Sequence, residues 1–199
     1  MKSKIFIPIL CCALTFTSCD SVLDNVRNLS NYPAQGTFDD IQTANAYLNS
    51  LYASTFSGWP VNMGNYADES GSILAPDAIN INNSAFKFWP YDVIRRVNIF
   101  LDEIPTGKLD ESDKSLLIAQ AKFIRAFLYF KMVYYHGGVP IIMEPQELTD
   151  DLMVRRNTTA ECFNFILRDL DDAITVLPPK YRNQDYGRID RAAALSFKG

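Results

Sequence analysis

The sequence predicts an all-α protein, a tetratricopeptide-like stack of helices joined by long irregular loops. Apolar residues recur at helical spacing in several segments. Pro and Gly separate these segments. Small side chains lie where helices could cross closely, as in helical repeat proteins, although the Trp and Tyr signature of that repeat is incomplete: Ala119, Ala121, Ala126, Ala173, Ala192 and Ala193.

The composition argues against a disordered protein and against a nucleic-acid-binding protein. The chain has 199 residues, of which 48% are hydrophobic and 21% charged, so wholesale disorder is excluded. The formal net charge is −4. A nucleic-acid partner is not expected, because the chain has no excess of Lys and Arg to neutralise phosphates.

The first 18 residues have the pattern of a bacterial export signal. A short positive start is followed by an apolar run over 5–16, which is too short to span a bilayer, and then by Thr17, Ser18 and Cys19. This ending predicts a lipoprotein signal peptide over 1–18, with lipid such as palmitate on Cys19. An ordinary secretory signal with incidental cysteines is the alternative. Residues 19–36 are then a lipidated tether or arm, and 37–199 form the helical domain.

The first helix is expected to begin in the manner of a capping box at Thr37 and Asp40. Its apolar positions recur from Ile41 to Tyr52, and we expect its end near residues 57–58. Residues 58–83 are rich in Gly, Asn, Asp and Pro, which predicts a long irregular loop. Loops of this length are uncommon without a function.

The second helix should start at Trp89 and Pro90, with Pro in its first position, and end at 105–107. A third helix is predicted over about 112–135. It is apolar on almost all sides, which indicates burial. Lys122 and Arg125 near its middle argue against a membrane span, so we place it at the centre of the stack. Gly137 and Gly138 should end it.

A short apolar piece over 139–143 resembles a strand. Thr158 and Glu161 form a capping box that begins the fourth helix, and Pro178 and Pro179 end it. Its predicted buried stripe consists of Phe163, Ile166, Leu167, Leu170, Ile174 and Leu177. A last helix begins within 188–199 and stops without a cap, so we expect the natural product to be longer.

Three further stretches carry a family resemblance. The first reads A-x-A-x-F-x-R-A-x-x-Y-F over 119–130 and leads into Y-x-G-G-V-P over 135–140. The second covers 155–177, and the third consists of Gly187 and Arg188 followed by the run A-A-A-L over 192–195. Together with the lipobox and with Trp89 followed by Arg95 and Asn98, these stretches resemble the SusD/RagB family of outer-membrane lipoproteins. The chain corresponds to the N-terminal part of such a protein.

The resemblance implies a non-catalytic nutrient-binding lipoprotein, anchored by its lipid in the outer membrane and facing the cell exterior. Such proteins capture an oligosaccharide or polysaccharide and pass it to a TonB-dependent outer-membrane transporter, which is the expected protein partner. Some members bind peptides instead, and a peptide-binding counterpart of the same architecture is the alternative. No cofactor is expected.

The candidate ligand contacts are aromatic and amide side chains in and beside the long loop. A glycan site needs flat aromatic faces against the C–H face of a sugar, with amides meeting its hydroxyls. Exposed loop residues on a rigid scaffold supply such contacts, and the candidates are Trp59, Asn65, Tyr66 and Trp89. The alternative is that each Trp packs beneath a loop.

Other chemistries find little support in the sequence. Glycosidases need two facing carboxylates, whereas the adjacent acids at 68–69 and 171–172 do not face each other and should be solvated. His136 is the only His, so a metal site or a catalytic triad is not expected, and we interpret this residue as structural or exposed. Cys162 is expected to be a small buried residue. A surface hydrolase and a scaffold that binds only proteins are the remaining hypotheses.

Overall fold

The computed structural model describes residues 36, 38–56, 88–146, 149–150 and 152–199. The chain divides into two units, Met1–Gly36 and Thr37–Gly199, and all described helices belong to the second. The predicted signal peptide, Cys19, nearly all of the tether and the loop candidates Trp59, Asn65 and Tyr66 lie outside the described residues. None of the described helices has the length and apolar character needed to cross a membrane.

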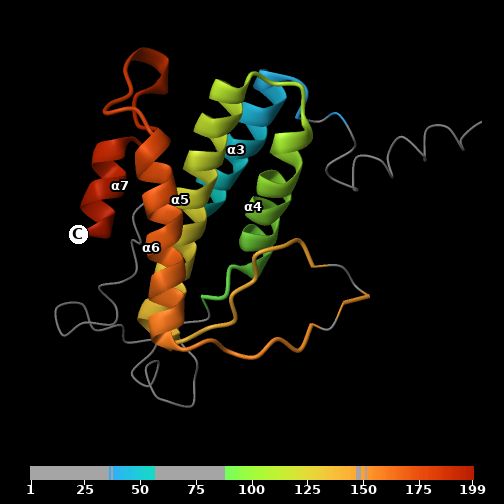
Figure 1. Cartoon of the computed structure of the whole chain (residues 1–199), viewed down its shortest axis with the longest axis vertical. Helices are drawn as coiled ribbons and strands as arrows, with labels where there is room; N and C mark the ends of the chain where they lie inside the picture. The colour runs from blue at the N-terminus through green and yellow to red at the C-terminus, as the bar shows by residue number, and fades with distance from the viewer. Residues whose placement is uncertain (1–35, 37, 57–87, 147–148, 151) are drawn as a thin grey trace, which may run out of the picture. The chain divides into compact units, whose positions relative to one another are not determined.

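The prediction of an all-α fold is confirmed, and the described residues contain no strand. The elements follow one another as helices with short 3-10 segments between them (Figure 1): α3 (Ile41–Thr55), α4 (Tyr91–Glu103), η3 (Ile104–Thr106), α5 (Glu111–His136), α6 (Thr159–Val176), η4 (Asn183–Asp185) and α7 (Arg191–Lys198).

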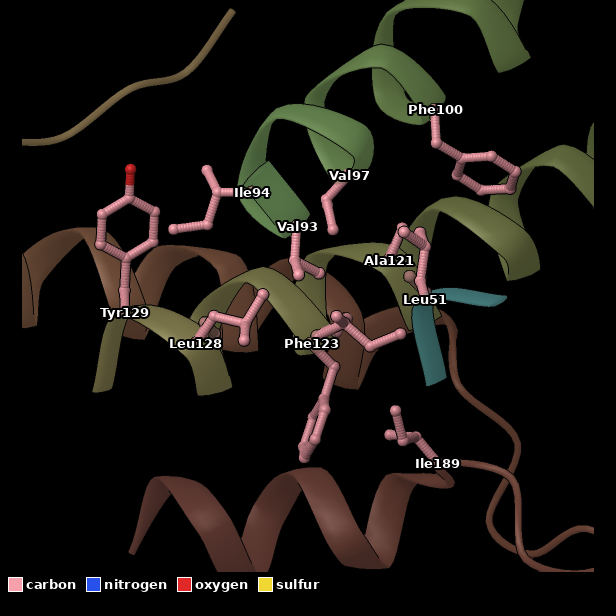
Figure 2. Packing of buried hydrophobic residues seen from close by; sticks show 14 of the residues in the cluster. Leu51, Val93, Ile94, Val97, Phe100, Ala121, Phe123, Leu128, Tyr129 and Ile189 are labelled. Carbon is pink, nitrogen blue, oxygen red and sulfur yellow. The ribbon is translucent and has the colours of Figure 1, made fainter. Parts of the chain in front are cut away.

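The long helix α5 is the centre of the stack, as its apolar sequence predicted. It packs against α3 and α4 on one side and against α6 on another, and α7 packs against α6 (Figure 1). In Figure 2, Val93, Ile94 and Val97 of α4 lie against the α5 surface that carries Leu128, whereas Phe123 points away from α4. Phe123 meets Phe197 of α7 at a ring distance of 5.5 Å. Burial of apolar surface on several sides of α5 therefore holds the helices together.

The first two helices begin at residues that differ slightly from the predicted ones. Asp40, and not Thr37, is the N-cap of α3, and its carboxylate accepts a hydrogen bond from the Thr43 backbone N–H at 2.8 Å. Pro90 is the N-cap of α4 and not its first helical residue. Its carbonyl accepts the first helical hydrogen bond, from Ile94, while its own backbone angles are not helical.

The apolar piece after α5 is not a strand, which corrects the prediction. Its backbone groups bond to side chains of the helices and of the loop before α6. The Tyr129 hydroxyl accepts from the Ile142 N–H at 2.8 Å, and Asn157 Oδ1 accepts from the Ile141 N–H at 3.0 Å. The Asn98 amide donates to the Ile142 carbonyl at 2.9 Å. These side chains replace the neighbouring strand that a sheet would need.

The capping box of α6 is confirmed. The Thr158 hydroxyl accepts from the Glu161 N–H at 3.2 Å, and the Glu161 carboxylate accepts from the Thr158 N–H at 2.7 Å. The predicted buried stripe is wrong at two positions, because Phe163 and Leu167 are exposed. The buried face consists instead of Cys162, Phe165, Ile166, Asp169, Leu170 and Ala173.

The buried face of α6, which differs from the predicted one, carries Asp169. This residue lies against Arg125 of α5, and both side chains are buried. The pair is bidentate, with Arg125 Nε and Nη2 lying 2.7 and 2.9 Å from the two carboxylate oxygens. Arg125 Nη1 also donates to Asn98 Oδ1 of α4 at 2.9 Å. Since Asn98 in turn holds the Ile142 carbonyl, one polar network ties α4, α5, α6 and the segment after α5 together.

Candidate ligand-contact site

Trp89 is the one predicted ligand contact that lies in the described part of the chain. It sits two residues before the start of α4, and its side chain is 46% exposed. Its ring nevertheless has defined neighbours.

Trp89 belongs to an aromatic stack with Tyr91 and His136. The Trp89 and His136 rings are nearly parallel, with centroids 4.1 Å apart and an interplanar angle of 10°. Trp89 and Tyr91 are also nearly parallel, at 6.3 Å and 12°. The stack joins the start of α4 to the last residue of α5.

Hydrogen bonds fix both partners of Trp89 in this stack. His136 Nε2 lies 3.2 Å from the Phe88 carbonyl, and since a carbonyl only accepts, Nε2 carries the proton. The Tyr91 hydroxyl donates to the Pro140 carbonyl at 2.9 Å. Burial raises the pKa of Tyr91 to about 12, so this hydroxyl remains a donor at neutral pH.

The turn after α5 is built around two glycines with different functions. Gly137 caps the helix with a φ of 69°, a left-handed conformation that favours glycine. At Gly138 the constraint is space, because a Cβ atom would lie 2.0 Å from the Asn157 carbonyl oxygen. Arg156 closes the turn by donating to the Gly138 carbonyl at 2.6 Å and also to the His136 carbonyl. The stack therefore rests on a tightly packed turn.

The aromatic stack offers a flat, partly exposed indole held by fixed neighbours. Such a surface suits the apolar face of a sugar ring, because an aromatic side chain supplies contact area with little freedom to lose on binding. The stack contains no pair of facing carboxylates.

Sequence reasoning singled out Trp89, whose contact with a ligand stays a prediction, but not the two rings that stack with it. His136 was expected to be structural or exposed, and Tyr91 was not singled out. The only local signals were an aromatic residue two positions after Trp89 and an imidazole directly before Gly137. The contact between Trp89 and His136 joins residues far apart in the chain, and no local pattern shows it.

The other described residues weighed for chemistry have structural surroundings, whereas the acids at 68–69 lie outside the described residues. Asp172 pairs with Lys122 at 2.5 Å, and Asp171 pairs with Lys198. Cys162 is fully buried, as predicted, and its sulfur contacts the Val139 backbone. Among the described residues, no group of three or more His, Cys, Asp or Glu side chains is placed to hold a metal ion.

The family model and the curated relatives that match this chain agree on one family. The SusD-like family described as "Starch-binding associating with outer membrane" matches residues 15–198. A curated SusD-like protein of Bacteroides ovatus is 28% identical over 211 residues, which cover 98% of this chain and 38% of that protein. SusD-like protein P25 of Formosa agariphila is 30% identical over 105 residues, covering 52% of this chain and 20% of that protein. The chain thus spans less than half of the curated relatives it matches.

Solved structures share the same helical arrangement. A SusD-like protein of Bacteroides fragilis matches with a TM-score of 0.66 and 25% identity, over 83% of this chain and 35% of that one. A laminarin-binding SusD-like protein matches with a TM-score of 0.66 and 25% identity, over 78% of this chain and 38% of that one. A second Bacteroides fragilis structure, 21% identical with a TM-score of 0.70 over 82% of this chain and 37% of that one, supports the fold alone.

Proposed function

We propose, from the premise that this chain belongs to the SusD-like family, that it is part of a cell-surface lipoprotein that captures oligosaccharides without cleaving them. The observation that carries the proposal is the half-exposed Trp89 indole, stacked on His136 at 4.1 Å. A SusD-like structure that binds laminarin shares the fold, which supports a glycan as the ligand class.

The non-catalytic part of the proposal is supported by the paired state of three acids on α6, two of which, Asp171 and Asp172, were weighed for catalysis. Asp171 and Asp172 each form an ion pair with a lysine, on the exposed side of α6. Asp169 is buried and held by Arg125. A glycosidase needs two carboxyl groups that flank one bond. None of these three acids is placed in that way.

The location and the partner follow from the signal and from the family. Cys19 would carry the lipid that anchors the protein in the outer membrane, facing the cell exterior. The captured glycan would pass to a TonB-dependent transporter in the same membrane. The family's description as outer-membrane-associated supports the location. Pull-down of a TonB-dependent transporter by the lipidated protein, and its loss with Cys19→Ala, would test both points.

The binding claim is tested on the full-length, non-lipidated protein. Affinity gels would carry laminarin, starch, xylan and other polysaccharides, and a parallel assay would measure new reducing ends. We expect retardation by at least one glycan with no new reducing ends. Trp89→Ala should abolish the retardation, while Phe163→Ala, which removes an aromatic ring of similar exposure on α6, should not. Release of new reducing ends would contradict the non-catalytic role.

A peptide-binding counterpart of the same architecture is the second candidate. No described residue favours it over a glycan, but the same protein can be tested with a peptide library in place of polysaccharides. Binding to peptides alone, with no glycan retarded, would replace the glycan proposal with this one.

A further inference from the structure

A cavity of about 140 Å³ lies beside the first turns of α5, between the start of α3 and the segment that contains η4. Acidic, amide, guanidinium and phenol groups line it together with three aliphatic side chains, and polar and apolar atoms contribute about equally to its walls. The lining residues on which the argument depends are Asn45, Asp113, Leu116, Gln120, Tyr181 and Arg188. We refer to this space as the polar cavity.

Some polar groups that line the polar cavity form no hydrogen bond with other described residues. Within the described part of the chain, the Asp113 carboxylate, Asn45 Oδ1 and Arg188 Nη2 make no hydrogen bond. They supply two acceptors and a donor around one small volume. Sugar hydroxyls both donate and accept, so such a mixed set matches them better than it matches a simple anion or cation.

Arg188 is held in place before any ligand arrives. Its Nε donates to Asp185 Oδ1 at 2.9 Å, and its Nη1 lies 3.4 Å from Gln120 Oε1. Gln120 is fixed in turn by the Tyr52 hydroxyl at 2.8 Å and by its own bond to the Leu116 carbonyl. A fixed guanidinium loses little freedom on binding, which favours recognition.

Tyr181 adds a second observation at the same place. Its ring lines the cavity, and its hydroxyl is buried with no hydrogen-bond partner among the described residues. Burial raises the pKa of this hydroxyl, so it stays protonated at neutral pH. A buried hydroxyl without a partner is unfavourable. A small shift of the ring on ligand binding would give it one.

The size and composition of the cavity select a class of ligand. An apolar cavity of about 150 Å³ holds one benzene molecule. A hexopyranose ring is larger than benzene, but this cavity is partly open to solvent, so such a ring can sit in it with part of its hydroxyls outside. Leu116 and Ile41 offer an apolar surface for the C–H face of such a ring. We propose that the polar cavity binds a single hexopyranose residue.

This site is distinct from the aromatic stack. Leu116 lies near the start of α5 and His136 is its last residue, so about 30 Å of helix separates the two sites. The inference rests on the proposed function, because a glycan ligand gives the two sites a common purpose. Two contacts on one polysaccharide raise the apparent affinity without any tighter single contact.

Saturation-transfer NMR on the full-length, non-lipidated protein tests the cavity directly, with D-glucose and D-galactose as probes. We expect transfer to at least one sugar to persist in Trp89→Ala, and to fall at least fivefold when Asp113→Asn or Arg188→Gln is added to that variant. Asp113 takes no part in the described hydrogen-bond networks, so Asp113→Asn should leave the thermal melt unchanged. Asp102→Asn, an equivalent change of an exposed acid on α4, is the matched control.

The outcomes separate the two proposals. Absence of transfer to both sugars in the wild-type protein, or transfer in Trp89→Ala that is unchanged when Asp113→Asn is added, would overturn the cavity proposal. Retardation by a polysaccharide that depends on Trp89 would then still stand. Transfer that depends on Asp113, together with no retardation by any polysaccharide, would support the cavity and overturn the capture function.

Discussion

At the scale of single residues, His136 supports Trp89 without being required to touch a ligand. The two rings are in van der Waals contact at a centroid distance of 4.1 Å, and the imidazole is tied to the Phe88 carbonyl. A flat ring at residue 136 should therefore preserve the site, whatever its capacity for hydrogen bonds. A small residue should leave the indole free to rotate.

We predict that His136→Ala weakens glycan binding by about three- to tenfold, whereas His136→Phe retains it within about twofold. The expected loss corresponds to about 0.7–1.4 kcal/mol. Calorimetry gives the affinity of each variant for the glycan. Equal binding by both variants would show that the imidazole does not position Trp89.

The buried pair of Arg125 and Asp169 gives a second residue-scale prediction. Asp169→Ala leaves the Arg125 guanidinium buried without its carboxylate and should reduce the free energy of unfolding by about 3–5 kcal/mol. Asp172→Ala, on the same helix, removes an exposed partner of Lys122 and should cost less than about 1 kcal/mol. Urea unfolding of both variants checks the contrast. Similar losses would mean that the buried pair does not stabilise the stack.

At the scale of elements, the features that depend on neighbouring residues could be predicted from the sequence. The features that depend on contacts between distant segments could not. The capping box of α6 was found because its donors and acceptors lie within four residues. The segment after α5 was misread as strand-like because its hydrogen-bond partners are side chains of Asn98, Tyr129 and Asn157. The stripe on α6 was misplaced because a charged residue, Asp169, lies on its buried face.

The same contrast between local and distant features applies to the candidate site. Trp89 could be singled out because an aromatic residue just before a helix and beside a long loop is a local pattern, and its contact with a ligand stays a prediction. Its stacking on His136 could not be predicted, because α4 and α5 must pack before the two rings meet. The polar cavity likewise combines residues from α3, α5 and the η4 segment, which no sequence window contains.

The capping box also predicts a pH dependence of the stability of α6. Hydrogen bonds from the Thr158 backbone and hydroxyl hold the pKa of Glu161 below its ordinary value of 4.5. A lowered pKa in the folded state means that the stabilisation is present above about pH 4.5 and is lost as pH falls through the folded value. The difference in Tm between the wild type and Glu161→Gln should therefore shrink below pH 4.5. A difference that stays constant down to pH 3 would contradict this assignment.

At the scale of the whole molecule, most of α5 is covered, but its last turn and the helices α6 and α7 expose apolar side chains. Tyr134, Phe163, Leu167 and Leu195 are all at least one-third exposed. Exposed apolar groups of this size favour association in isolated domains. We therefore predict that residues 20–199 alone are marginally stable or aggregate.

Thermal unfolding and light scattering of residues 20–199, measured beside the full-length, non-lipidated protein, test this prediction. We expect a lower Tm and concentration-dependent scattering for residues 20–199 alone. A cooperative transition at a high Tm, with no scattering, would show that the described helices are sufficient for a stable fold.

Isothermal titration calorimetry of the full-length, non-lipidated protein with its best glycan tests the central claim most directly. Wild type, Trp89→Phe and Trp89→Ala would be compared, and the glycan recovered afterwards for size analysis. The account predicts an intact glycan, modest weakening in Trp89→Phe, and at least a tenfold loss in Trp89→Ala, which is about 1.4 kcal/mol. Unchanged affinity in Trp89→Ala would contradict the aromatic stack as the ligand contact, and a shortened glycan would contradict non-catalytic capture.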